Sequence, residues 1–235
     1  MKSEQVRRRS DHRGRRCAIG RCSNEESLVA TATMDDVLDA IEQIDLGQGW
    51  EAIAPGLVPL LPRRRPLPPM DPPLSRVVAP GLRISYGVDI GPAFWYVAEK
   101  QLPEWGVTVD ELAERALANV RARAKARSQF GLIHEMVADV PTLAFQSREG
   151  WASALLLLPD ELARVFGDEP RLILAPMRDV IFGLPLDTDR KFARWFQEEL
   201  CALDMNALDV PLLTFAGGEL HLDGRLPGHG RPRYH

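Results

Sequence analysis

Four polar side chains interrupt apolar segments of this sequence and could form a ligand site. Asp89 lies near the end of a strand-like run, Asn119 at the edge of a helical apolar stripe, and Arg178 and Asp179 between two apolar runs. If they converge, two carboxylates, an amide and a guanidinium would form a polar pocket for an anion or small ligand. The alternative interpretation is structural: the aspartates close turns, Asn119 caps a loop, and Arg178 pairs with an acid.

Other catalytic and metal-binding patterns are incomplete. His134 and Glu135 begin like a zinc protease motif, but Ala138 occupies the position of the second histidine ligand. Cys17 and Cys22 could bind zinc, yet a structural zinc site needs four ligands. No Walker loop, G-x-G-x-x-G or G-x-S-x-G motif occurs. The sequence therefore predicts no metal and no cofactor.

Charge is divided unevenly along the chain. The formal net charge is -4, but residues 1–22 contain eight basic and two acidic side chains, so the remainder is strongly acidic. An acidic body argues against nucleic-acid binding by the folded part, whereas the arginine-rich segment could contact a polyanion. Because this segment has no apolar periodicity, we predict a disordered basic tail over residues 1–33. Met34 precedes the first expected helix, so an alternative interpretation treats that tail as an extension.

A helical segment and then a proline-rich segment follow this tail. Apolar spacing behind Thr33 predicts a helix over residues 34–46, within a helical segment over 34–54. Nine prolines between residues 55 and 80 predict a linker or extended arm. Pro66 and Pro69 also provide the P-x-x-P spacing of ligands for aromatic grooves.

Residues 81–223 have the pattern of a folded α+β domain, followed by a disordered tail over 224–235. A capping box at Thr108 and Glu111 begins a helix that extends to about Arg127. Residues 151–158 fit either a strand or a buried helix start. The other expected elements are a hairpin of 82–90 and 93–98, strands over 142–146, 171–176 and 180–184, helices over 160–166 and 188–203, and a terminal hairpin of 212–215 and 219–222.

Frequent hairpins without a long βαβ series favour a mixed, largely antiparallel sheet packed against two or three helices. The helix over residues 188–203 is expected to bury five apolar side chains, namely Phe192, Trp195, Phe196, Leu200 and Leu203. No run of about 18 apolar residues is present, so we expect no membrane span.

The order of four segments resembles the YtpQ-like family of bacterial proteins, a domain of unknown function. The segments are YGVDIGPAFWYV, WGVTVDELAERALANV, ASALLLLPDELARVFG and LILAPMRDVIFGLP, and the resemblance spans roughly residues 80–215. It implies a cytoplasmic bacterial protein. It brings no established activity, cofactor or site residue.

Two functions follow as expectations. The lack of a complete catalytic motif favours a non-catalytic binding or interaction module with an unknown protein or small-molecule partner. The alternative is an enzyme of unrecognised type, such as a hydrolase, which uses the polar pocket around Asp89, Arg178 and Asp179.

Overall fold

The structure is a computed structural model that describes residues 49–65, 72–79, 82–91, 93–127, 132–147 and 149–222, together with Asp36 and Asp39. The predicted tails over 1–33 and 224–235 and the P-x-x-P motif lie outside these residues. Within the predicted helix over 34–46, only Asp36 and Asp39 are described, and both are helical.

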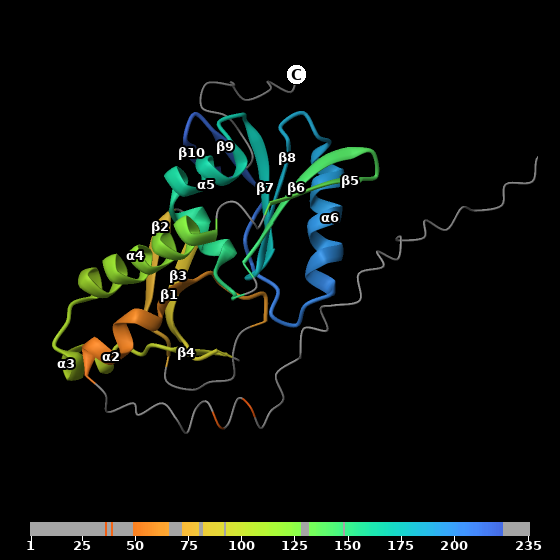
Figure 1. Cartoon of the computed structure of the whole chain (residues 1–235). Coiled ribbons are helices and arrows are strands. Elements are labelled where there is room, and N and C mark those ends of the chain that lie inside the picture. Colours follow the sequence, from red (N-terminus) through yellow and green to blue (C-terminus); the bar gives the residue numbers. More distant parts are fainter. Residues whose placement is uncertain are drawn as a thin grey trace, which may run out of the picture. The chain divides into compact units, whose positions relative to one another are not determined.

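A four-stranded sheet is built around its longest strand, β3 (Leu82–Asp89), to which every other strand is antiparallel (Figure 1). On one side, β1 (Leu57–Leu60) pairs with β3 so that Leu57 lies opposite Val88. On the other side, β2 (Ser75–Ala79) and β4 (Phe94–Tyr96) pair with successive parts of β3. Both β1 and β2 are therefore edge strands of this sheet.

A six-stranded sheet has the order β10-β9-β7-β8-β6-β5, and each neighbouring pair is antiparallel. Its free edges are β10 and β5. The strands are β5 (Leu132–Val137), β6 (Val140–Gln146), β7 (Arg171–Met177), β8 (Val180–Pro185), β9 (Leu213–Ala216) and β10 (Glu219–Leu222).

Helices cover both sheets. The longest helix, α4 (Val109–Arg127), packs against β1, and α6 (Arg190–Ala202) packs against β7 (Figure 1). The predicted capping box at the start of α4 is confirmed, because Glu111 N–H donates to Thr108 Oγ1 at 3.2 Å and Thr108 N–H donates to Glu111 Oε2 at 2.8 Å. The shorter helices are α2 (Trp50–Ile53), η1 (Ala54–Gly56), α3 (Gln101–Trp105), η2 (Ala152–Leu157) and α5 (Pro159–Phe166).

Two apolar cores lie on opposite faces of the six-stranded sheet. The larger core joins one face of that sheet to the four-stranded sheet, α4 and η2, and it includes Ile173 and Ala175 of β7. The smaller core lies against α6 and includes Leu172 and Leu174. Because alternate residues of a strand point to opposite faces, both faces of β7 are buried, which explains its uninterrupted apolar sequence.

The interpretation of residues 55–80 as a linker or arm is wrong for the described part of that range. Leu57–Leu60 forms a strand whose four residues are all buried, and Ser75–Ala79 forms a second strand. The folded domain therefore begins before residue 81. Pro59 fits within β1 because an edge strand has one side on which no ladder hydrogen bond is lost.

The arginines that follow β1 are also part of the fold. The N–H of Arg64 donates to the carbonyl of Ala207 at 2.9 Å, and the N–H of Asp209 donates to the carbonyl of Pro62 at 2.7 Å. Arg64 also forms an ion pair with Glu198 of α6. These contacts fix the segment after β1 beside the loop that follows α6.

The α+β class with largely antiparallel pairing is confirmed, although the strands form two sheets. The expected burial of α6 is wrong at two positions: Trp195 is 53% exposed and Leu203 is 81% exposed, because α6 contacts the sheet on one face only. The ambiguous segment 151–158 is largely the 3-10 helix η2. No helix within the described ranges has the length and apolar character needed to cross a bilayer.

Candidate functional site

Asp89, the last residue of β3, contacts α4 and the following turn. Its Oδ2 accepts a hydrogen bond from Arg123 Nη1 at 2.8 Å, and its Oδ1 accepts one from the N–H of Gly91 at 3.0 Å. Both carboxylate oxygens are therefore engaged. The contacts match the structural interpretation, in which this aspartate closes a turn.

Asn119 joins α4 to the segment that leads into β1. Its Nδ2 donates to the carbonyl oxygens of Ala54 at 2.7 Å and Leu57 at 2.9 Å. The amide thus satisfies two backbone acceptors of a neighbouring segment, as the structural interpretation expected.

Arg178 extends from the turn between β7 and β8 to the aromatic side chains of β4. Its guanidinium carbon lies 5.3 Å from the ring centre of Phe94 and 5.7 Å from that of Tyr96. Its Nη2 donates to the Tyr96 hydroxyl. Burial lowers the pKa of Arg178, and Tyr96 partly offsets this change. Within the described ranges no ion pair joins Arg178 to an acid, so aromatic rings take the place of the expected carboxylate.

Asp179 closes the same turn against the loop before η2. Its Oδ1 accepts hydrogen bonds from Ser147 Oγ at 3.2 Å and from the N–H of Gly150. Gly150 has a φ of +71°, and a Cβ there would lie 2.6 Å from the Phe94 ring, so glycine fits this position on both counts. Asp179 therefore has a local structural partner that differs from that of Arg178.

The four predicted site residues each contact a different part of the fold. Asp89 faces Arg123, Asn119 faces backbone carbonyls, Arg178 faces aromatic rings, and Asp179 faces the loop before η2. None of the four lines the groove described next.

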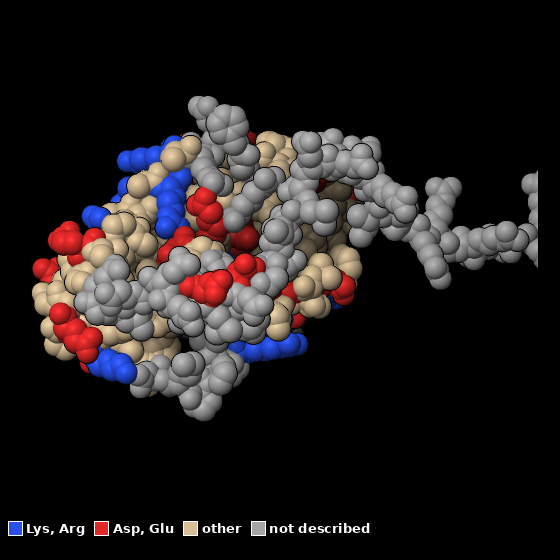
Figure 2. All heavy atoms as spheres, turned by 60° about the horizontal axis from the view of Figure 1, so that its bottom comes forward, with Lys and Arg blue, Asp and Glu red and all other residues tan. Residues whose placement is uncertain are grey.

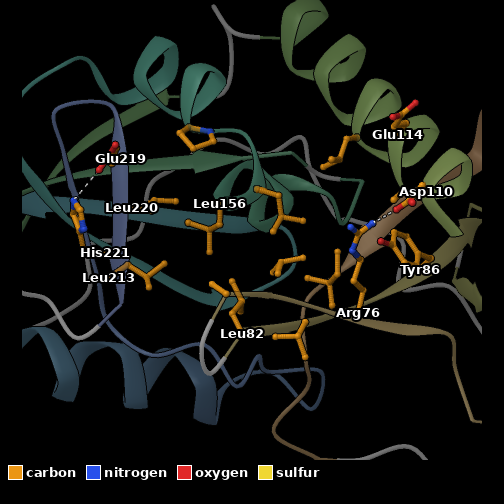
Figure 3. A pocket seen from close by; sticks show the side chains of 18 of the residues that line it. Arg76, Leu82, Tyr86, Asp110, Glu114, Leu156, Leu213, Glu219, Leu220 and His221 are labelled. Atoms are coloured by element: carbon orange, nitrogen blue, oxygen red, sulfur yellow. Dashed lines mark hydrogen bonds and ion pairs between the residues drawn. The ribbon is translucent and has the colours of Figure 1, made fainter.

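A groove of about 860 Å³ opens between the two sheets (Figure 3). Its size lies within the range typical of ligand pockets. Its walls come from the edge strand β2, the core face of β3, the first half of α4, the region around η2, and the hairpin of β9 and β10. Most of the lining is apolar, with Val77, Val78, Ala79, Leu82, Ile84, Ala113, Leu117, Leu156, Leu157, Pro159, Leu213 and Leu220.

Tyr86 lies at one end of this groove and is only 1% exposed. Figure 3 shows its ring beside the Arg76 side chain. Burial raises the pKa of Tyr86, and the charge of Arg76 together with a hydrogen bond from its side chain partly offsets the rise. Arg76 therefore interacts with both Tyr86 and Asp110 at this end of the groove.

Charged side chains form the rim of the groove. Arg76 Nη1 lies 2.6 Å from Asp110 Oδ1, and His221 Nε2 lies 3.9 Å from Glu219 Oε2 (Figure 3). Glu114 of α4 has no ion-pair partner within the described ranges. With His221 neutral, these rim residues together carry more negative than positive charge.

The lining of the groove contains no serine, threonine or cysteine that could act as a nucleophile. No three metal-ligating side chains gather anywhere in the described residues. Cys201 is on the buried face of α6, and burial raises the pKa of its thiol, which leaves it in the unreactive protonated form. Cys17 and Cys22 lie outside the described residues.

Sequence reasoning missed this groove because its walls meet only in the folded chain. Val77 and Val78 belonged to the stretch interpreted as a linker, and the terminal hairpin carried no chemical motif. The one available signal was Tyr86, a hydroxyl at a buried position in the alternating pattern of β3.

Comparison with known proteins finds no matching family model, curated protein or solved structure. The resemblance to the YtpQ-like family therefore stays a prediction.

Proposed function

We propose that this chain is a non-catalytic binding module whose ligand occupies the groove between the two sheets. The observation that carries the proposal is the groove itself, which has a volume of about 860 Å³ and a mainly apolar lining with charged side chains at its rim. A ligand of this size would cover the apolar surface and keep its polar groups at the charged rim.

Binding is favoured over catalysis by the chemistry of the lining. The apolar side chains of the groove supply surface that a ligand can cover. The charge of Arg76 is already paired with Asp110. The lining holds no serine, threonine or cysteine for acyl transfer, and no cluster of three metal-ligating side chains occurs in the described part of the chain.

A dye-binding experiment tests the groove directly. Nile red, a neutral apolar dye, should bind the full chain and gain fluorescence. Val77→Asp places a charge on the groove wall at a 58% exposed position and should weaken dye binding by about tenfold, since a carboxylate resists burial against the dye. Ile133→Asp is the matched control, because Ile133 is a 45% exposed apolar residue on β5, which does not line the groove. Equal loss in both variants, or no binding at all, would contradict the proposal.

A second variant separates ligand binding from folding. Tyr86→Phe removes the hydroxyl beside Arg76 and retains the ring that lines the groove, so urea unfolding should show a loss of about 1 kcal/mol or less. Nile red binding should be unchanged, because the hydroxyl has almost no exposed surface and the dye contacts the apolar lining. A loss of dye binding as large as that in Val77→Asp would show that the ligand depends on the hydroxyl.

Further aspects of the expected function remain proposals with their own support. The order of the four segments between residues 80 and 215 supports membership of the YtpQ-like family and a cytoplasmic bacterial location. The acidic remainder of the chain argues against nucleic acid as a partner of the folded body. On the face shown in Figure 2, acidic side chains are scattered, while basic ones gather at its upper left and along its lower edge.

A further inference from the structure

Free edges of both sheets border the groove. β2 ends the four-stranded sheet and β10 ends the six-stranded sheet. Residues Arg76–Ala79 of β2 and Glu219–His221 of β10 line the groove. Within the described ranges, β2 pairs with β3 alone, so the other side of its backbone has donors and acceptors that no described strand satisfies.

The edge of β2 also carries exposed apolar side chains. Val77 is 58% exposed and Val78 is 41% exposed, in a strand with only Arg76 as a charged residue. Edge strands of soluble proteins are usually protected by charge, by proline, by a β-bulge or by a covering segment. The pairing of β2 with β3 shifts register between Val77 and Ala79, so the regular part of this edge is Ser75–Val77. This part, beside an apolar groove, is suited to receive another strand.

The charge of the rim indicates the chemistry of that strand. Asp110 is paired with Arg76 and Glu219 lies beside His221, whereas Glu114 has no ion-pair partner within the described ranges. Basic side chains on a bound segment would complement these acids.

We propose that the groove receives an extended peptide segment with alternating apolar and basic residues, which adds as a strand to the free edge of β2. This inference rests on the proposed binding function and identifies its partner class. Alternate side chains of an added strand point to opposite faces, so the apolar set enters the groove while the basic set meets the rim. The backbone of the segment pairs with Val77 and its neighbours.

Synthetic peptides test the pairing. A labelled peptide of alternating lysine and valine should bind the full chain in fluorescence anisotropy, and a glutamate and valine peptide should bind at least about tenfold more weakly. Only alternate N–H groups of a strand face one neighbour. N-methylation of one alternate set should therefore abolish binding, while methylation of the other set should preserve it. Equal effects of the two methylated peptides would show attraction by charge alone and would overturn strand addition.

Hydrogen exchange locates the bound peptide. Amides of Ser75–Ala79 should exchange more slowly when the lysine and valine peptide is bound, whereas amides of β5, the free edge remote from the groove, should be unchanged. Protection of β5 instead of β2 would overturn the assignment. Glu114→Gln together with Glu219→Gln should weaken peptide binding, whereas Glu135→Gln, an exposed position on β5 outside the groove, should leave it unchanged.

The outcomes separate this inference from the proposed function. Nile red binding without peptide binding would leave the groove as a ligand site and overturn strand addition. Failure of both probes would overturn both proposals. Sedimentation tests whether a second copy of this chain occupies the groove. A native dimer that becomes a monomer in Val77→Asp would show that the occupant is a second copy, and it would overturn the peptide partner.

Discussion

The side-chain Nδ2 of Asn119 lies 2.7 Å from the carbonyl oxygen of Ala54, which is 65 positions earlier in the sequence. The same amide group reaches the carbonyl of Leu57 at 2.9 Å. One polar side chain of α4 therefore holds the turn that starts β1. A residue that looked like a candidate ligand contact in the sequence instead joins two distant parts of the backbone.

Asn119→Ala should destabilise the protein by about 2 kcal/mol, because two partly buried carbonyls lose their donor. Urea unfolding followed by circular dichroism measures this change. Asn206→Ala is the control, since Asn206 is exposed, and it should have little effect. An unchanged free energy of unfolding in Asn119→Ala, combined with weaker ligand binding, would restore the ligand interpretation.

Asp89 and Arg123 should show a coupling of about 1 kcal/mol in a double-mutant cycle of Asp89→Asn and Arg123→Gln. The pair is short, at 2.8 Å, and partly buried, with side chains 18% and 22% exposed. The free energies of unfolding of the four proteins provide the measurement. Strict additivity would show that the pair contributes nothing to the attachment of β3 to α4.

Arg178→Met should destabilise the fold by about 2 kcal/mol, because methionine retains apolar packing but loses the charge over both rings and the bond to Tyr96. Tyr96→Phe is the matched partner, since it retains the ring and removes only the hydroxyl. Tyr96→Phe should lower the free energy of unfolding by about half as much as Arg178→Met. Equal losses in thermal and urea unfolding would assign the whole effect to the hydrogen bond, in contradiction to a role for the rings.

The free energy of unfolding should depend on pH through the Glu111 carboxylate of the capping box. Hydrogen bonds from the Thr108 N–H and hydroxyl lower the pKa of Glu111, so the folded state binds the proton less readily than the unfolded state. This stabilisation is present at neutral pH and is lost as the pH falls through the lowered pKa. The stability difference between the native chain and Glu111→Ala should therefore be largest near neutral pH and shrink in acid. Glu111→Gln cannot titrate, so its difference from Glu111→Ala should stay constant across the same series of urea unfolding curves.

Local patterns predicted much of the fold. The capping box, the glycine turn of the last hairpin and the strands on either side of Arg178 depend on neighbours within a few residues, and each appears in the structure. The strands β1 and β2 were missed because prolines nearby indicated a linker. Both strands form by pairing with β3, a partner that no local pattern could supply.

The sequence by itself determined the α+β class, the helix boundaries that caps and glycines set, and the polar residues worth attention. Tertiary structure alone decided what those residues contact. The hydrogen bond between Asn119 and Ala54 and the stacking of Arg178 on Phe94 join segments that are far apart in the sequence, and no local pattern links such segments. It also created the groove, whose walls come from five regions of the chain. A cavity is a property of how surfaces pack, so it has no counterpart in the order of the residues.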